Sequence, residues 1–179
     1  MPQHVSRVGH VVLVGGGLGV APVYPQLRAF KEAGNRTTGI IGFRNKDLVF
    51  WEETFGRYCD NLIVCTDDGS YGKPGFVTAA LQEVCQSERP DLVVAIGPLP
   101  MMNACVETTR PFDVKTMVSL NAIMVDGTGM CGSCRVTVGS EIKFACVDGP
   151  DFDGHQVDFK ELMLRQKRFK GEEAAANTD

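Results

Sequence analysis

Short apolar runs alternate with amphipathic segments from residue 10 to about residue 119. The runs are typical of buried strands, and the segments between them place apolar residues at helical spacing. Alternating strands and helices imply right-handed crossovers and a parallel sheet covered on both faces. The pattern predicts strands over 10–17, 37–43, 61–66, 91–97 and 114–120, and helices over 21–34, 48–59, 75–86 and 100–109.

This alternation stops after residue 119, where glycine and aspartate become frequent. Residues 134–146 predict two short strands around Gly139 and Ser140, a two-residue hairpin connection. Residues 157–170 are amphipathic and predict a terminal helix. We expect an α/β fold with a doubly wound parallel sheet over 8–119, a small appendage with its helix over 120–170, and a disordered tail over 171–179.

Length and charge exclude some classes of partner. At 179 residues the chain is long enough to bury a core without disulfides. Its net charge of -4 and its scattered Lys and Arg residues predict no nucleic-acid partner. No apolar run reaches the ~18 residues that cross a bilayer, and the first residues lack the apolar segment of a signal peptide. The sequence therefore predicts a cytoplasmic protein that does not enter a membrane.

Seven cysteines in a chain without an export signal argue against a disulfide framework. Cys65, Cys85 and Cys105 are isolated in predicted strands or helices, where burial as small apolar side chains explains them. Three others lie in the glycine-rich, hairpin-like region and need another explanation: Cys131, Cys134 and Cys146.

The stretch GGGLGVAP, residues 15–22, follows a predicted strand and opens a predicted helix. Backbone N–H groups at such a turn can bind a pyrophosphate, although the spacing departs from GxGxxG and a tight turn alone would also need glycine. Two further loops, at 66–75 and 97–102, end strands at the same sheet edge, where open α/β sheets bind ligands. The candidate nucleotide-binding residues are Gly15, Gly16, Gly17, Gly19, Ala21, Pro22, Arg44, Asp67, Asp68, Gly69, Gly97, Pro98, Met101 and Met102.

The choice between NAD(H) and NADP(H) stays open on residues alone. Arg44 is placed to pair with a 2′-phosphate, whereas Asp67 or Asp68 would accept from ribose hydroxyls and repel that phosphate. The alternative is that Arg44 caps a loop and the aspartates shape a turn. The three histidines, His4, His10 and His155, are too scattered to form a catalytic group, so we expect surface or capping roles and no catalytic residue.

Four motifs in order, GGGLGVAPVYPQL, GFRNKDLVFWEE, TDDGSYGKPGFVT and GPLPMM, resemble the NAD(P)-binding half of the ferredoxin reductase superfamily. Specifically, the sequence resembles electron-transfer subunits of the dihydroorotate dehydrogenase type, and the resemblance extends from about residue 10 to residue 169. It implies an oxidoreductase component that moves electrons between NAD(P)H, a flavin and an iron-sulfur cluster, and it favours NAD(H). Members carry an N-terminal β-barrel that binds FAD, and this sequence starts directly at the nucleotide domain, so we expect it to need a flavin domain or partner.

In those subunits a C-terminal loop resembling C-x4-C-x2-C, followed by a fourth cysteine, binds a [2Fe-2S] cluster. The resemblance implies the same cluster here, with the ligands Asp126, Cys131, Cys134 and Cys146. With aspartate in the first position, this loop is similar to that of the small subunits of NADH-dependent reduced ferredoxin:NADP oxidoreductases. Those subunits pair with a large glutamate-synthase-like flavoprotein, which implies such a partner and ferredoxin or another redox protein.

Other interpretations of this loop remain. A zinc knuckle has compatible thiolate and carboxylate ligands, and a loop of free thiols is a third possibility. A structural zinc site would accompany a different function, that of a non-catalytic nucleotide-binding regulatory or scaffold subunit. Gly127, Gly129 and Gly132 favour the cluster, because they would let backbone N–H groups approach bridging sulfides. Asp126 could also simply start a turn through a side-chain to backbone hydrogen bond.

Overall fold

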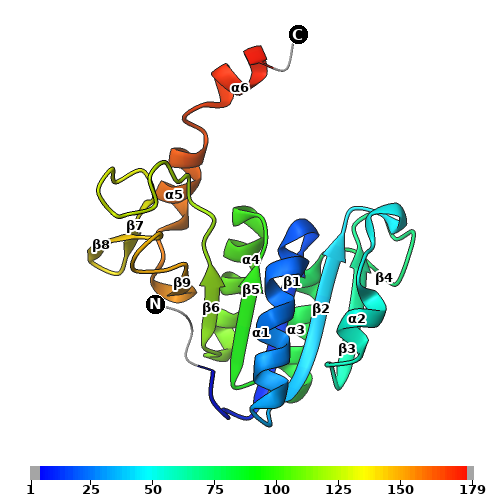
Figure 1. Cartoon of the computed structure of the whole chain (residues 1–179). Helices are drawn as coiled ribbons and strands as arrows, with labels where there is room; N and C mark the ends of the chain where they lie inside the picture. Colours follow the sequence, from blue (N-terminus) through cyan, green and yellow to red (C-terminus); the bar gives the residue numbers. More distant parts are fainter. Residues whose placement is uncertain (1–4, 177–179) are drawn as a thin grey trace.

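The computed structural model describes residues 5–176, which form a layered α/β body with a smaller lobe at one edge (Figure 1). The main sheet has seven strands in the order β4-β3-β2-β1-β5-β6-β9. Its strands are β1 (His10–Gly16), β2 (Arg36–Phe43), β3 (Asn61–Thr66), β4 (Lys73–Pro74), β5 (Leu92–Ile96), β6 (Thr116–Ser119) and β9 (Asp151–Asp153).

The strands pair in parallel except at one edge, where β9 is antiparallel to β6 and places Phe152 opposite Val118. The doubly wound α/β fold expected from the alternation is confirmed, with the correction that the sheet is mixed. β9 comes from the region expected to form only an appendage. Its short sequence, with aspartates on both sides of a buried Phe152, carries no run of apolar residues that marks a strand.

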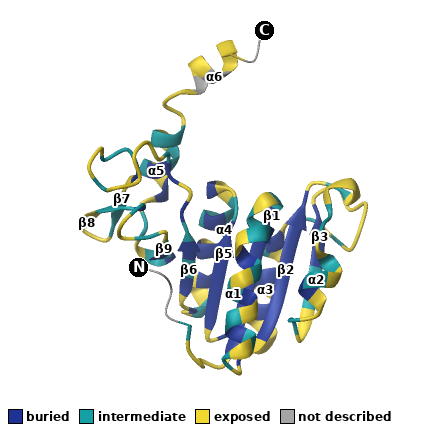
Figure 2. Ribbon diagram, in the orientation of Figure 1, coloured by how far each residue is buried: buried dark blue, intermediate teal, exposed yellow. Residues whose placement is uncertain are grey.

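Helices cover both faces of the sheet. The segment of β1 is buried throughout because neighbours and helices enclose it, which explains its continuous apolar run (Figure 2). Side chains of α1 (Val20–Glu32) and α2 (Glu52–Gly56) pack on one face, and those of α3 (Val77–Glu88), α4 (Leu99–Thr109) and α5 (Phe159–Gln166) join a second core cluster on the other. Within the described residues, no helix is long and apolar enough to span a bilayer.

Short elements complete the chain. The helix expected over 48–59 is only the five-residue α2, because Trp51 adopts a left-handed φ of 61° immediately before it. The expected tail contains a helix, α6 (Lys170–Ala176), and residues 177–179 lie outside the described part. The 3-10 helices are η1 (Gly17–Gly19), η2 (Lys46–Leu48), η3 (Arg110–Phe112) and η4 (Gly154–Gln156).

The smaller lobe contains the hairpin of β7 (Arg135–Val138) and β8 (Glu141–Phe144). Val138 pairs with Glu141, so Gly139 and Ser140 form the expected two-residue connection, with Gly139 at φ 61°. The terminal helix expected over 157–170 is observed as the shorter α5, which Asp158 caps by accepting from the Glu161 N–H.

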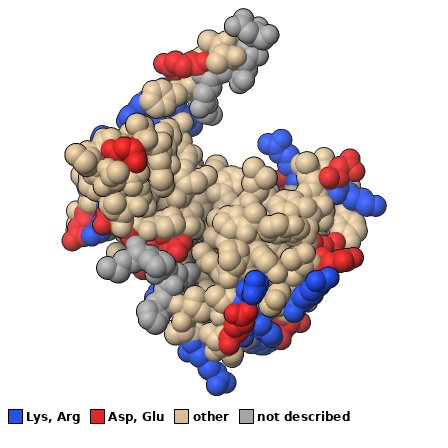
Figure 3. Space-filling model, viewed as in Figure 1, with Lys and Arg blue, Asp and Glu red and all other residues tan. Residues whose placement is uncertain are grey.

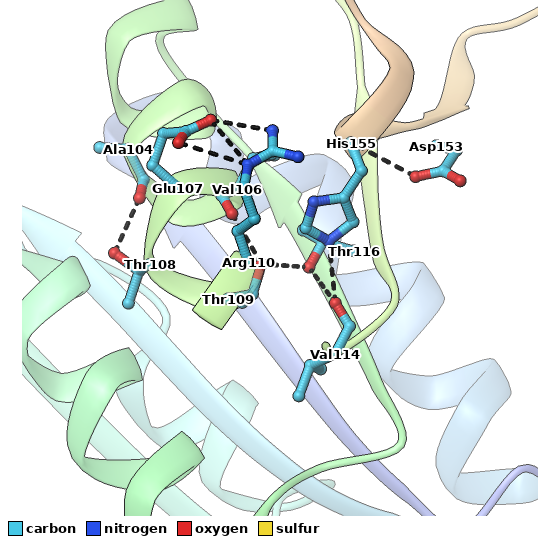
Figure 4. Close-up of polar contacts among 10 residues, drawn as sticks. All are labelled: Ala104, Val106, Glu107, Thr108, Thr109, Arg110, Val114, Thr116, Asp153 and His155. Carbon is cyan, nitrogen blue, oxygen red and sulfur yellow. Dashed lines mark hydrogen bonds and ion pairs between the residues drawn. The ribbon is translucent and has the colours of Figure 1, made fainter. Parts of the chain in front are cut away.

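Polar contacts join this lobe to the main sheet (Figure 4). The ring Nε2 of His155, in η4, lies 3.0 Å from the carbonyl oxygen of Val114, and its backbone N–H donates to Asp153. Beneath it, the hydroxyls of Thr109 and Thr116 lie 2.6 Å apart in a fully buried pair. Because α4, β6 and η4 meet here, the lobe has a defined attachment to the sheet.

Candidate nucleotide crevice and cysteine loop

The glycine loop connects the carboxyl end of β1 to α1 at the centre of the sheet. β1 lies between β2 and β5, and the helices that follow β1 and β5 cover opposite faces. The strand order therefore changes direction between β1 and β5, and such a switch point leaves a ligand crevice. Gly17 adopts φ 54° in η1, and Ala21 and Pro22 form the first turn of α1.

Close packing explains why glycine occupies this loop. A Cβ built on Gly19 would lie 2.7 Å from the carbonyl carbon of Ile96 and 2.8 Å from the Cα of Gly97. A Cβ on Gly16 would collide with the half-buried side chain of Met101, which also lies over Gly97. The structure thus brings Gly16, Gly19, Gly97 and Met101 together, and their binding of a nucleotide stays a prediction.

Other predicted residues of this crevice differ in accessibility. Pro98 is exposed at the N-cap of α4, at the mouth of the switch point. Met102, one residue after Met101, is fully buried in the core because α4 turns it toward the sheet. Gly15 is also buried, inside β1. Gly16 is buried with it at the end of β1, so the structure gives Met102, Gly15 and Gly16 supporting positions.

The loops after β2 and β3 lie together at the same sheet edge. The backbone N–H of Asp68 donates to the carbonyl oxygen of Arg44 over 3.2 Å, which brings the backbones of these two candidate residues side by side. Asp68 also accepts from the N–H and hydroxyl of Ser70, contacts that lower the pKa of its carboxyl. These are turn contacts, as the alternative interpretation expected, and Gly69 at φ 72° completes the turn. Asp67 and Arg44 are exposed.

Sequence reasoning missed several side chains that build this edge. Ser70 accepts from the N–H of Lys46, and the hydroxyl of Tyr71 donates to Glu52 over 2.9 Å. Phe76 is 67% exposed beside the same loop. Aromatic residues within a polar, glycine-rich loop after a strand are the sequence signal that could have identified Tyr71 and Phe76.

The histidines differ from the expectation of surface or capping roles. His10 is 8% exposed, its ring Nε2 lies 2.9 Å from the Thr38 hydroxyl, and burial lowers its pKa. His10 is the first residue of β1, so it lies at the amino end of this strand, whereas the crevice lies at its carboxyl end. His155 is half-buried at the lobe contact described above, and His4 lies outside the described residues.

Asp126 begins the cysteine loop and binds two of its backbone N–H groups. Its carboxylate accepts from Thr128 over 2.8 Å and from Cys131 over 2.9 Å. These bonds, chiefly the one from Thr128, lower the pKa of the carboxyl and hold it as an anion. Gly127, at φ 72°, permits the turn. The carboxylate and Cys131 therefore lie at one end of the loop, both exposed.

Cys134 and Cys146 meet at the other end of the site. Their sulfur atoms lie 3.2 Å apart, because the hairpin places Cys134 opposite Ala145. The hydrogen bond from Cys134 raises the pKa of Cys146, and a backbone hydrogen bond from Gly129 opposes this effect. Gly129 thus joins the Asp126 turn to Cys146. At Cys131, the N–H of Ser133 lowers the thiol pKa and favours thiolate, the form that binds metals.

The four predicted ligands form two pairs. Asp126 and Cys131 are linked through the loop backbone, and Cys134 and Cys146 touch directly. Across the described residues, no three His, Cys, Asp or Glu side chains converge on one point as a mononuclear metal site requires. The structure thus brings the four predicted ligands together two by two, and their binding of a metal centre stays a prediction.

Helix α5 supports the cysteine loop through a contact that sequence reasoning missed. The guanidinium of Arg165 donates to the carbonyl oxygen of Ser133, the residue before Cys134. Beside it lies a cavity of about 50 Å³. Its lining combines apolar side chains from Ala122, Ile123, Val125, Leu162 and Phe169 with Ser133, Arg165, Gln166 and Arg168.

Known proteins resemble this chain both in the region of the cysteine loop and along most of its length. Residues 121–158 match the iron-sulfur cluster binding domain of dihydroorotate dehydrogenase B. An electron transfer subunit homolog of dihydroorotate dehydrogenase B (NAD(+)) from Thermotoga maritima is 48% identical over 172 residues, which cover 96% of this chain and 61% of the relative. The electron transfer subunit of Shouchella clausii is 38% identical over 159 residues, covering 87% of this chain and 60% of that relative.

Solved structures agree on the fold. A structure of the NADH-dependent reduced ferredoxin-NADP oxidoreductase, related to flavin-based electron bifurcation, is 46% identical with a TM-score of 0.90 and covers 98% of this chain and 63% of that chain. The C-terminal domain of the PF1911 hydrogenase of Pyrococcus furiosus is 23% identical with a TM-score of 0.57, covering 66% and 96%, and shares the fold alone. The chain spans about three-fifths of the length of the curated relatives described above.

Proposed function

Because this chain is a homologue of the electron-transfer subunits of dihydroorotate dehydrogenase B and has a ferredoxin reductase-like fold, we propose that it transfers electrons between a nicotinamide dinucleotide, a flavin and a [2Fe-2S] cluster. The cysteine loop carries this proposal. Its three thiols and one carboxylate lie in two pairs. The glycines between them carry no side chain that would cover the backbone N–H groups of the loop.

The four residues would hold the cluster as Asp126 with Cys131 and Cys134 with Cys146. A cluster of this kind supplies one-electron transfer, which zinc does not. Within this chain, Gly129 already donates a backbone hydrogen bond to Cys146, and such bonds to sulfur tune the reduction potential. The aspartate contributes a harder, less covalent donor than a thiolate.

The dinucleotide would lie across the switch point, with its pyrophosphate at the glycine loop and its ribose toward Asp67 and Asp68. These carboxylates repel a 2′-phosphate, so we favour NAD(H) over NADP(H) despite the nearby Arg44. Met101 would contact the nicotinamide half, because it lies over Gly16 and Gly97. The residues position the dinucleotide, and no side chain of the crevice is assigned a proton transfer.

The flavin and the partners belong to the same proposal. The chain matches 61% of the T. maritima relative, and we place FAD on a domain equivalent to the unmatched part or on a partner. A large glutamate-synthase-like flavoprotein and ferredoxin, or another redox protein, would complete the assembly. Cysteines without disulfides fit a cytoplasmic location, where thiols stay reduced.

Anaerobic purification followed by metal, sulfide and flavin analysis tests the proposal. We expect about two iron and two sulfide per chain, with the visible spectrum of a [2Fe-2S] protein. Reduction by NADH should be slow until a flavoprotein partner is added and rapid afterwards. One zinc without sulfide would instead support a structural knuckle and a non-catalytic scaffold.

A further inference from the structure

Helix α5 contacts the cysteine loop and the strand β7 that follows Cys134. The guanidinium of Arg165 donates to the Ser133 carbonyl oxygen over 3.2 Å. Glu161, one turn earlier, accepts from the hydroxyl of Thr137 over 2.6 Å. Since Ser133 lies between Cys131 and Cys134 in the chain, the first contact restrains the backbone that separates two proposed ligands.

The surroundings of Arg165 strengthen its charge effect. The side chain is half-buried and forms part of the cavity beside Leu162 and Phe169, so water screens it incompletely. Burial lowers the pKa of Arg165, and the neighbouring Arg135 and Arg168 add to this effect, whereas Glu161 and then Cys134 oppose it. The guanidinium stays ionised, and its contact with the Ser133 carbonyl oxygen places it one residue from Cys134 in the chain.

We propose that Arg165 is a positioning residue of the cluster site, fixing the Cys131–Cys134 segment through Ser133 and raising the reduction potential through its charge. The inference rests on the proposed cluster. Reduction adds one negative charge to the site, and a fixed positive charge next to Cys134 stabilises that added charge. A purely structural role in fastening α5 would leave the potential unaffected by charge.

Two substitutions separate charge from packing. Arg165→Gln removes the charge and keeps a side-chain donor, while Arg165→Lys keeps the charge and loses the planar fork. Lys160→Gln is the matched control, because it removes one positive charge from an exposed side chain of the same helix. All three variants should be prepared as the full chain alongside the wild type.

Three properties are measured for each variant: the iron and sulfide content, the thermal unfolding, and the reduction potential from a redox titration that paramagnetic resonance monitors. We expect Arg165→Gln to lower the reduction potential. The change in the one-electron equilibrium constant should be up to tenfold, which corresponds to 59 mV. Arg165→Lys should stay close to the wild type, and Lys160→Gln should match it. Equal potentials for Arg165→Gln and Lys160→Gln would overturn the inference while leaving the proposed function intact.

If Arg165→Gln binds no iron, Arg165→Lys decides the outcome. A Lys variant with a bound cluster and the wild-type potential supports the inference, whereas a Lys variant that lacks the cluster, or has a lowered potential, overturns the role of charge. A wild-type chain that binds zinc and no sulfide would overturn the proposed function, and this inference with it.

Discussion

The sheet domain and the cysteine-loop lobe use their apolar residues in opposite ways. In the sheet, β1, β2 and β5 are almost fully buried between helices. In the lobe, some apolar side chains such as Val136 and Leu162 are buried, but as many point outward, including Met130 at 88% exposed and Val125 at 74%. Figure 3 shows that uncharged side chains cover most of this lobe on the face drawn.

This difference separates structure that stabilises itself from structure that needs a ligand. A sheet covered on both faces has its apolar surface already removed from water, and that burial is the main stabilising contribution to folding. The lobe gains less from burial, so metal binding would supply part of its folding free energy. Its exposed apolar side chains are also typical of a surface that another protein covers, as the proposed partner would.

Gly19→Ala tests the sheet side of the comparison and has the largest expected effect. A Cβ there would collide with the backbone of Ile96, which cannot move aside as a flexible side chain can. We expect a loss of about 3 kcal/mol in the free energy of unfolding, measured by urea denaturation, together with weaker NADH binding. Gly56→Ala is the control, because nothing lies within 4 Å of its Cβ. Equal stability of the two variants would contradict the packing argument.

Cys131→Ser tests the lobe side. Because Cys131 is exposed, its loss should remove the iron yet change the unfolding of the sheet by only about 0.5 kcal/mol. Cys105→Ala should behave in the opposite way, since this buried thiol packs in α4: it should keep the iron and lose about 1 kcal/mol of stability. Iron analysis and urea denaturation of both variants measure the contrast. Retention of full iron by Cys131→Ser would remove it from the ligand set.

Substitutions of Asp126 test whether this residue of the lobe is a metal ligand or only forms a turn. Asp126→Cys should keep the cluster and shift its potential, because thiolate and carboxylate differ in covalency with iron. Asp126→Ala should make the cluster labile. Asp126→Asn preserves a side-chain acceptor for the Thr128 turn but is a poorer anionic ligand. An unchanged redox titration and paramagnetic resonance spectrum in Asp126→Asn would reject the ligand assignment.

His10→Gln has the smallest expected effect and separates the two regions by pH. Burial and the nearby Arg36 lower the pKa of His10 below its ordinary value of 6.5, while Glu88, Asp91 and Asp60 act in the opposite direction. Below pH 6.5 the unfolded chain therefore binds a proton that the folded chain does not, and the free energy of unfolding falls as pH decreases.

The variant should show a smaller loss of stability between pH 7 and pH 5, measured by urea denaturation at each pH. The iron content of the lobe at pH 7 should not change, since His10 lies at the far edge of the sheet. An identical dependence on pH in the wild type and the variant would show that other groups cause it.

Strong local patterns determined most of the sheet. The apolar runs at 10–17, 37–43, 61–66 and 91–97 match β1, β2, β3 and β5, because a central strand buried on both faces needs continuous apolar sequence. The hairpin at Gly139 and Ser140 followed from turn chemistry, which acts within a few residues. The glycine loop and the cysteine spacing were equally visible, since both are local and rare.

Tertiary contacts decided the rest. β9 is a strand only because the edge of β6 is available to it, and Met102 is buried only because α4 faces the sheet. The pairing of Cys134 with Cys146 and the contact of Arg165 with Ser133 join residues 12 and 32 positions apart. Such contacts depend on where separate elements come to lie in space, and no periodicity or motif within one segment records that position.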